Sequence, residues 1–338
     1  MPVRIRLEEG DALQSPCDVL VVKYAQDNYG VDYEVTRALE AQGIPPEKMR
    51  PSPGGFRFHE SRGGVTANFV LFVGVDPLPL LDYEKIRAFA SKSLRDLAGR
   101  LPDATTVAYT LHGPGYGLDE KESFDCLLAG LADALRSGDS PSGISEIHII
   151  ERNPGRKRRL DAFLSGDSPS QPQQEQGSPS ERPAAKGSTL DFEEAALERL
   201  SEAVGDSDLK RRVFVAMPFS GAKEDHYHYG IQTAVNDAEM LCERIDESAF
   251  MGDVLDQIKS RIADAWVMIA DLSGKNPNVF LEVGYAWGKG IPTILLADSP
   301  EGLTFDVQGQ RCLIYSSIRD LQMKLSKELQ VLAEGAGS

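Results

Sequence analysis

The sequence WVMIADLSGKNPNVFLEVGYAWGKGIPTILL, residues 266–296, contains the clearest signals of secondary structure in this 338-residue chain. The apolar run Trp266–Ala270 predicts a strand that is buried on both faces of a parallel sheet. The pair Asn276–Pro277 predicts a helix start, because asparagine caps helices and proline fits the first helical position. Gly290 predicts the end of that helix, and Thr293–Leu296 predicts the next strand. The stretch is therefore a strand–helix–strand unit of a layered α/β sheet.

The predicted helix has two faces at about 100° per residue. The face predicted to pack in the core carries Val279, Val283, Ala286 and Trp287, and the other carries Asn278, Glu282, Tyr285 and Lys289. Asp271 ends the first strand at its carboxyl edge, where open parallel sheets bind ligands. Glu282 lies one turn into the helix, beside that edge. The pattern alone also fits a solvated glutamate that the helix dipole stabilises, so both interpretations stay open.

Four blocks within residues 211–333 resemble the TIR-like and nucleoside 2-deoxyribosyltransferase-like superfamily. They are VFVAMPFS at 213–220, RIDE at 244–247, IADLSGKNPNVFLEVGYAWGKGIPTILL at 269–296 and LTFDVQGQRCLIY at 303–315. The resemblance implies that a helix glutamate attacks or stabilises the anomeric carbon when a base–sugar bond is cleaved. The matching position is Glu282. Related folds also hold non-catalytic nucleotide sensors, so the fold alone does not decide the activity.

The predicted catalytic residues are Glu282 and Asp271. A carboxylate can trap the sugar cation covalently and so divide the reaction into two displacements. Asp271 would orient ribose hydroxyls or assist the base; its alternative role is to cap the Ser273–Lys275 turn. The residues predicted to contact substrate are Met217, Pro218, Phe219, Tyr229, Asp246, Glu247, Asn278 and Tyr285. Loop packing and strand-end turns are the alternatives for those that lie in loops.

Residues 1–164 alternate predicted strands with predicted helices, which indicates a second layered α/β domain. The strands are predicted at Val3–Leu7 (an edge strand), Asp18–Lys23, Asn68–Gly74, Thr105–Leu111 and Glu146–Ile150, and the helices at Tyr33–Gln42, Tyr83–Gly99 and 120–135. A basic run at residues 152–159 is interpreted as a solvated helix start.

This first domain resembles macro domains and the macro-like N-terminal domain of leucine aminopeptidases. The resemblance rests on Gly10-Asp11 before the DVLVV strand, and on a glycine-rich loop after Thr105–Leu111. It implies a pocket for an ADP-ribose-like or nucleotide ligand, lined by His112, Gly113, Gly115, Tyr116 and Gly117. Glycines let backbone N–H groups approach a diphosphate. A plain strand-to-helix turn is the alternative.

Residues 165–188 are rich in Ser, Pro, Gln and Gly and predict a disordered linker. Residues 189–204 regain helical periodicity and predict a connecting helix. Residues 211–333 then predict a doubly wound parallel sheet of five strands. The strands are predicted at Arg212–Met217, Glu243–Ile245, Trp266–Ala270, Thr293–Leu296 and Arg311–Tyr315, and the helices beyond the one after Pro277 at Tyr229–Cys242, Gly252–Ala263 and Ile318–Leu332.

The composition excludes several classes of function. The formal net charge is −16 and the pI about 4.8, which argues against general nucleic-acid binding and against an anionic membrane surface. No apolar run is long enough to cross a bilayer and no signal core precedes the first strand, so a cytoplasmic protein is predicted. The four cysteines form no CxxC pair, which predicts buried free thiols. His226 and His228 lack a third ligand nearby, so neither a metal nor a cofactor is predicted.

Three functional hypotheses follow. The first is an N-glycosidase or N-ribosyltransferase that acts on a nucleoside, nucleotide or NAD-like substrate through Glu282. Such a domain beside a nucleotide-sensing domain resembles bacterial stress and phage-defence effectors. The second is a non-catalytic nucleotide-binding sensor, and the third is a module that assembles as a homo-oligomer through TIR-like contacts.

Overall fold

The computed structural model describes residues 3–27, 29–165, 188–192, 207–218, 220–245, 254–300 and 311–335, with positions 169 and 198. The chain divides into two compact units. The first contains Met1–Gly113, Glu120–Asp167 and Gln174–Ser207, and the second contains Pro114–Asp119, Ser168–Gln173 and Asp208–Ser338. Each unit is a layered α/β structure, which confirms the predicted fold class.

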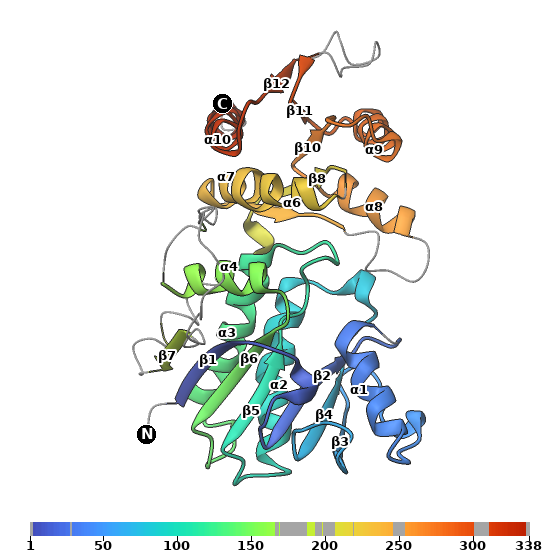
Figure 1. Ribbon diagram of the computed structural model, residues 1–338, viewed down its shortest axis with the longest axis vertical. Coiled ribbons are helices and arrows are strands. Elements are labelled where there is room, and N and C mark those ends of the chain that lie inside the picture. Colours follow the sequence, from blue (N-terminus) through green and yellow to red (C-terminus); the bar gives the residue numbers. More distant parts are fainter. Residues whose placement is uncertain are drawn as a thin grey trace, which may run out of the picture. The chain divides into compact units, whose positions relative to one another are not determined.

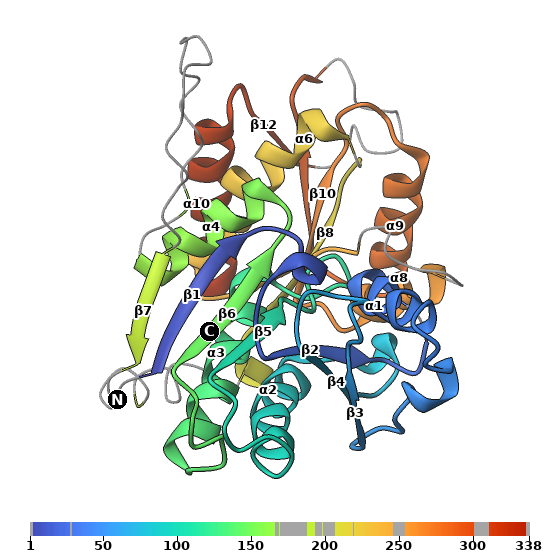
Figure 2. The same ribbon diagram turned by 60° about the horizontal axis from the view of Figure 1, so that its bottom comes forward.

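The first unit is built on a mixed sheet, whose seven described strands lie in the order β3-β4-β2-β5-β6-β1-β7 (Figure 2). The strands are β1 (Val3–Glu9), β2 (Val19–Tyr24), β3 (Phe56–Glu60), β4 (Phe69–Gly74), β5 (Thr106–Thr110), β6 (Glu146–Glu151) and β7 (Ser188–Phe192). β3 and β7 run antiparallel to their neighbours β4 and β1, and the other pairs are parallel. The prediction that Val3–Leu7 is an edge strand is wrong, because β7 pairs with it on its outer side.

Four helices of the first unit are α1 (Gly30–Glu40), α2 (Tyr83–Ala98), α3 (Glu120–Arg136) and α4 (Pro154–Ser165). The helices α1 and α2 cover opposite faces of the sheet. This follows from Ala108 and Tyr109 of β5, because successive side chains of a strand point to opposite faces. Ala108 belongs to the apolar cluster that contains Val35 of α1. Tyr109 instead lies 2.7 Å, hydroxyl to hydroxyl, from Ser93 of α2.

The α2–α3 contact requires a glycine. A Cβ atom built on Gly130 of α3 would lie 2.1 Å from the carbonyl oxygen of Arg87 in α2. Any larger residue at position 130 would therefore push the two helices apart.

The basic run at residues 152–159 is a solvated surface only in part, because Arg152 and Arg158 are exposed but Arg159 is buried. Arg159 Nε donates to Glu120 Oε1 at 2.7 Å and Arg159 Nη2 to Glu120 Oε2 at 2.8 Å, with both side chains almost fully buried. Arg156 Nε lies 3.1 Å from Glu120 Oε2. Arg156 and Arg159 therefore join α4 to the first turn of α3.

The second unit contains the predicted five-stranded parallel sheet, in the order β12-β11-β10-β8-β9. Its strands are β8 (Arg212–Ala216), β9 (Leu241–Glu243), β10 (Val267–Asp271), β11 (Thr293–Ala297) and β12 (Cys312–Ile314). Its helices are α6 (Gly221–Asp225), the π-helical segment η5 (His226–Gln232), α7 (Thr233–Asp237), α8 (Val254–Ala263), α9 (Pro277–Gly288) and α10 (Ile318–Gly335). The helix predicted from Tyr229 therefore begins earlier, at Gly221, and contains a π-helical stretch.

Alternate residues of β8 divide the helices of this unit between the two sheet faces. Val213 and Val215 pack in one core cluster with α7 and α10. Phe214 and Ala216 pack in a second cluster with α8 and α9. Figures 1 and 2 show the two helix layers on either side of β8 and β10.

The ends of α9 follow the sequence signals. The side chain of Asn276 accepts a hydrogen bond from the Asn278 N–H at 2.9 Å, and Pro277 occupies the first turn. Gly290 has a φ of +73°, the left-handed conformation that glycine adopts without strain. The core face is confirmed for Val279, Val283 and Ala286. Trp287, in contrast, was wrongly predicted to be in the core, because its side chain is 39% exposed.

The region between the two units lies largely outside the described residues. The predicted disordered linker is wrong at its two ends, because Ser165 belongs to α4 and Ser188 to β7; apart from position 169, the residues between them lie outside the described residues. The predicted helix at 189–204 is wrong for its first residues, which continue β7 to Phe192; its remainder is described only at position 198, which is helical. None of the helices in the described ranges is long and apolar enough to span a membrane. Three of the four free cysteines are buried, as predicted, and Cys312 is half-buried.

Candidate functional site

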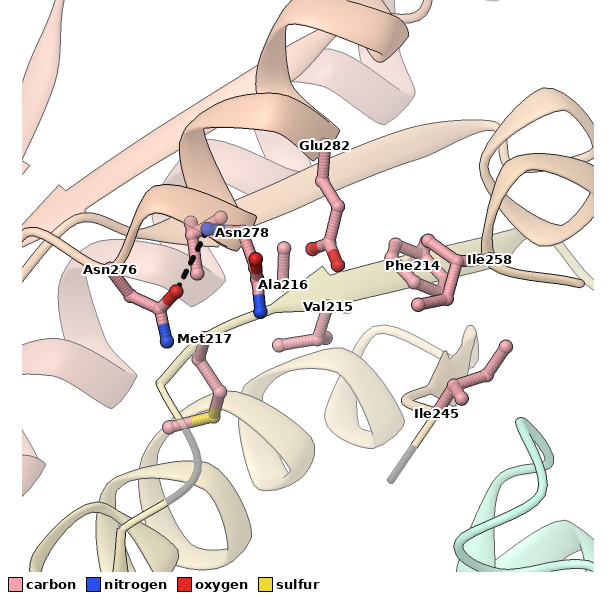
Figure 3. Close-up of a pocket in the computed structure, with 10 residues that line it drawn as sticks. Phe214, Val215, Ala216, Met217, Ile245, Ile258, Asn276, Asn278 and Glu282 are labelled. Carbon is pink, nitrogen blue, oxygen red and sulfur yellow. Dashed lines mark hydrogen bonds between the residues drawn. The ribbon is translucent and has the colours of Figure 1, made fainter. Parts of the chain in front are cut away.

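A small pocket lies where β8 ends and α9 begins, and Glu282 lines it. Figure 3 shows the Glu282 side chain descending from α9 toward β8, with its carboxylate directed into the pocket. The lining residues are Phe214, Val215, Ala216, Met217, Ile245, Ile258, Asn276, Asn278, Val279 and Glu282. The structure thus brings together three of the predicted site residues, Met217, Asn278 and Glu282, at the carboxyl edge of the sheet.

The pocket is narrow. Its cavity volume is about 10 Å³, far below the several hundred Å³ that is usual for ligand sites. That volume is room for one water molecule at most. A bound sugar would therefore reach the Glu282 carboxylate only after neighbouring side chains, such as Met217 and Asn278, move apart.

Other predicted contacts lie elsewhere or outside the described residues. Pro218 directly follows Met217 but is not among the described residues that line the pocket. Tyr229 is buried within η5. Tyr285 is half-buried on α9, with the Lys289 ammonium 5.7 Å from its ring centre. Three of the predicted contacts, Phe219, Asp246 and Glu247, lie outside the described residues.

Asp271 belongs to a different cluster of polar side chains at the same sheet edge. It is 1% exposed, and its Oδ1 accepts the Ser273 N–H at 2.9 Å. Its Oδ2 accepts the Tyr315 hydroxyl at 3.0 Å and lies 3.5 Å from the Lys223 ammonium. The hydrogen bond from the Ser273 N–H caps the turn that begins at Ser273, which is the alternative role considered for Asp271. Asp271 is not among the described residues that line the Glu282 pocket.

Lys223 and Tyr315 connect this cluster across the sheet edge. Lys223 Nζ donates to the Tyr315 hydroxyl at 2.8 Å and to Asp298 Oδ2 at 3.0 Å. Burial alone would lower the pKa of Lys223, but its hydrogen bond to Tyr315 and the Asp271 charge outweigh burial and raise that pKa above its usual range. Burial and the Asp271 carboxylate raise the pKa of Tyr315. A charged lysine and a neutral tyrosine therefore hold the ends of β10 and β12 to α6.

Sequence reasoning missed Lys223 and Tyr315. The two residues are 92 positions apart. Tyr315 ends the block at 303–315, but nothing in that block indicates that it will contact Lys223. The available signal was the position of Tyr315, which is the last residue of the predicted strand Arg311–Tyr315 and so lies at the edge where parallel strands place their carboxyl ends.

In the first unit, a second group of buried polar residues lies where the strand order reverses. From β2 the chain continues to β4 on one side of β2, while β5 pairs on its other side. Lys23 of β2 forms an ion pair with Asp32 in the first turn of α1, and each side chain is 5% exposed. His112, which follows β5, is 6% exposed. Such reversal points are where doubly wound sheets bind ligands.

Two polar atoms of this group lack a hydrogen-bond partner among the described residues: His112 Nε2 and Asp32 Oδ1. Burial lowers the pKa of His112, and the nearby Lys23 charge lowers it further, so the imidazole is neutral at neutral pH. Burial raises the pKa of Asp32, against the opposing effect of Lys23. A neutral imidazole and a carboxylate with unused hydrogen-bonding capacity therefore lie at the reversal point.

The predicted ligand loop is divided between the two units. His112 and Gly113 belong to the first unit, whereas Pro114–Asp119 belongs to the second. Gly113, Gly115 and Gly117 have φ values of +111°, +84° and +94°, which favour glycine. Within the second unit, Tyr116 forms an antiparallel bridge with Ile245. The ligand lining proposed for this loop stays a prediction.

The prediction of no metal site concerned the His226 and His228 pair. His228 Nδ1 lies 2.9 Å from Gln232 Oε1, and the His226 ring lies 5.6 Å from the Tyr315 ring. Throughout the part of the chain that the structure describes, no group of three or more His, Cys, Asp or Glu side chains is arranged to hold a metal ion.

Comparison with known proteins gives matches among solved structures alone. No protein-family model matches the chain, and no curated protein matches it. A Trypanosoma brucei macrodomain in complex with ADP matches 47% of this chain and 68% of its own, at 14% identity and a TM-score of 0.38. An Oceanobacillus iheyensis macrodomain with MES bound matches 48% of this chain and 90% of its own, at 12% identity and 0.37.

The macro domain of ganglioside induced differentiation associated protein 2 matches 47% of this chain and 83% of its own, at 12% identity and a TM-score of 0.38. These neighbours are macrodomains, the class that residues 1–164 resemble, and they cover about half of the chain. At these identities and TM-scores the similarity assigns neither a family nor a ligand. The resemblance of residues 211–333 to the TIR-like superfamily stays a prediction.

Proposed function

We propose that the second unit cleaves or transfers the N-glycosidic bond of a nucleoside, nucleotide or NAD-like molecule, with Glu282 as the reacting carboxylate. The observation that carries the proposal is the position of that carboxylate. It lines a pocket at the carboxyl edge of a parallel sheet, together with the amide side chains of Asn276 and Asn278. This edge is where open α/β sheets bind their ligands.

The proposed reaction uses two displacements. The bond between C1 of the sugar and the base nitrogen breaks, and its electron pair leaves with the base. A Glu282 carboxylate oxygen forms a bond to C1 or stabilises the cation that develops there. Water or a second base then attacks C1 and restores the carboxylate. Asn278 would hydrogen-bond the sugar hydroxyls, and the Met217 side chain would contact the sugar or base.

The test is release of free base from NAD and from deoxynucleosides by the full chain, followed by chromatography. Glu282→Gln keeps the size of the side chain and removes its charge, so we expect it to abolish release with little change in thermal unfolding. Glu334→Gln, at an exposed glutamate of α10, is the matched control and should retain full activity. Release that persists in Glu282→Gln would refute the assignment.

A second candidate function, nucleotide binding without chemistry, is favoured by the unsatisfied His112 Nε2 and Asp32 Oδ1 in the first unit. A ligand with hydroxyl or amino groups could hydrogen-bond both atoms. Titration of the full chain with ADP-ribose and with ADP tests this function, because a bound ligand raises the unfolding temperature. His112→Phe should remove that rise, whereas no rise in the parent protein excludes the candidate.

A further inference from the structure

Arg244 is a largely buried arginine at the carboxyl edge of the second unit's sheet. It directly follows β9, the strand that pairs with β8, and its side chain is 11% exposed. The central carbon of its guanidinium lies 3.8 Å from the centre of the Tyr227 ring, so one planar face of the cation is covered. Its Nη2 donates to Glu224 Oε2 at 3.1 Å. Two neighbours therefore fix the orientation of this cation.

The other terminal nitrogen of Arg244 contacts the wall of the Glu282 pocket. Arg244 Nη1 lies 3.6 Å from the sulfur of Met217, and Met217 lines the pocket. Figure 3 shows the Met217 side chain extending from the end of β8 away from the Glu282 carboxylate. Met217 therefore contacts both the pocket and the guanidinium.

The thioether of Met217 is a weak partner for a cation. Its sulfur accepts hydrogen bonds poorly, whereas an anionic oxygen in the same place would form a short, charge-assisted hydrogen bond. The pocket is too small for a sugar until Met217 moves. The movement that admits a sugar to Glu282 therefore also gives Arg244 Nη1 access to the substituents of that sugar. An anionic substituent would offset the loss of the Met217 contact.

Phosphate is the anion that this arrangement fits best. Arginine donates from a rigid planar fork that matches phosphate oxygens, and a fork already held by its neighbours loses less entropy on binding. The nearby Glu224 carboxylate is not an isolated negative charge, because it accepts from Arg244 and lies 3.4 Å from His228 Nε2. Nucleotides and NAD-like molecules carry a phosphate on C5 of the sugar, where nucleosides carry a neutral hydroxyl.

We propose that Arg244 binds the phosphate on the sugar of the substrate, so that the second unit acts on nucleotides or NAD-like molecules in preference to nucleosides. The inference rests on the proposed function, because it concerns the substrate of the Glu282 pocket. Arg244 is a specificity residue and does not touch the bond that breaks. It holds the phosphate end of the sugar while C1 faces the Glu282 carboxylate.

The first test compares substrates that differ in their phosphate. Base release by the full chain is measured from deoxynucleoside 5′-monophosphates, from the corresponding deoxynucleosides and from NAD. We expect kcat/KM to be about 10- to 100-fold higher with the phosphate-bearing substrates, which is the usual effect of one hydrogen bond to a charged group. Arg244→Gln should remove this preference, mainly through KM. A parent protein that cleaves nucleosides as well as nucleotides overturns the proposal.

Arg261→Gln is the matched control for the loss of a buried arginine. The Arg261 side chain is 13% exposed and lies 3.4 Å from Glu243, much as Arg244 pairs with Glu224. A general loss of folding lowers the cleavage of both kinds of substrate alike, so the ratio of their kcat/KM values isolates phosphate recognition. That ratio should be unchanged in Arg261→Gln and reduced in Arg244→Gln. An equal reduction in both variants refutes the assignment of Arg244.

A binding measurement separates this proposal from the proposed reaction. Ribose 5-phosphate has no base to release, and it should raise the unfolding temperature of the parent more than ribose does. Arg244→Gln should remove that difference, and Arg244→Lys should keep part of it, because its charge persists without the planar fork. A difference that persists in full in Arg244→Gln overturns the proposal.

The two proposals can fail separately. If ribose 5-phosphate stabilises the protein through Arg244 but no substrate releases base, the reaction is wrong and the phosphate site stands. If base is released without any preference for phosphate, the reaction stands and the phosphate site is wrong.

Discussion

Replacing Lys23 with methionine tests the buried ion pair of the first unit. The Lys23 and Asp32 side chains are each 5% exposed, so the change leaves the Asp32 carboxylate buried without its countercharge. Breaking one side of a buried pair typically costs about 3–5 kcal/mol of unfolding free energy. For a unit of this size, that corresponds to a decrease of about 6–20 °C in its unfolding temperature. Scanning calorimetry and far-ultraviolet circular dichroism on the full chain measure this decrease in unfolding temperature.

The destabilisation caused by Lys23→Met should also depend on pH in a defined direction. Burial already raises the pKa of Asp32, and loss of Lys23 removes the charge that opposes this shift. An acid whose folded pKa is raised contributes stability below its unfolded pKa and loses it as the pH rises through the folded pKa. The destabilisation of Lys23→Met should therefore be smaller at about pH 5 than at about pH 8.

A double variant provides the control. Lys23→Met with Asp32→Leu removes both charges and should recover most of the lost stability, because no buried ion remains. If Lys23→Met alone unfolds within about 2 °C of the parent, the interpretation of Lys23 and Asp32 as a tightly buried pair is wrong. The same conclusion follows if the double variant is no more stable than the single one.

Two further predictions concern the second unit. Tyr315→Phe removes the hydroxyl that donates to Asp271 and accepts from Lys223. Its loss should lower the unfolding free energy, measured by urea titration, by about 1–3 kcal/mol. An unchanged urea midpoint would show that these hydrogen bonds do not stabilise the second unit. Glu224 has its pKa lowered to about 2, because hydrogen bonds from His228 and the Arg244 charge outweigh burial. The Glu224 carboxylate therefore contributes stability above its ordinary pKa, and this contribution is lost as the pH falls toward 2. Glu224→Gln should make the unfolding free energy less dependent on pH in that range. An unaltered pH dependence would show that the Glu224 carboxylate does not stabilise the fold.

The elements that were predicted well depend on signals within a few residues of one another. Asn276 and Gly290 define α9 because capping is a local interaction, and the sequence shows it directly. Parallel strands such as β8 and β10 are continuous apolar runs, since both faces are covered. The placement of Glu282 at a sheet edge followed from the order of strand, loop and helix.

The features that were missed depend on partners far along the chain. Nothing near Arg159 indicates that Glu120 will neutralise it, so its run resembled an ordinary solvated surface. The residues after Thr189 have helical periodicity, yet they pair with β1, because an open sheet edge supplies backbone hydrogen bonds that outweigh local preference. Trp287 lies at the border between the two faces of α9, where periodicity does not decide burial.

The pairing of β7 with β1 has a practical consequence for dividing the chain. A fragment cut within residues 165–187 would keep β1 but lose β7, and the backbone groups of β1 that face β7 would then have no partner. Unprotected strand edges of this kind recruit strands from other molecules and aggregate. A soluble version of the first unit should therefore extend at least to Phe192, although α4 already ends at Ser165.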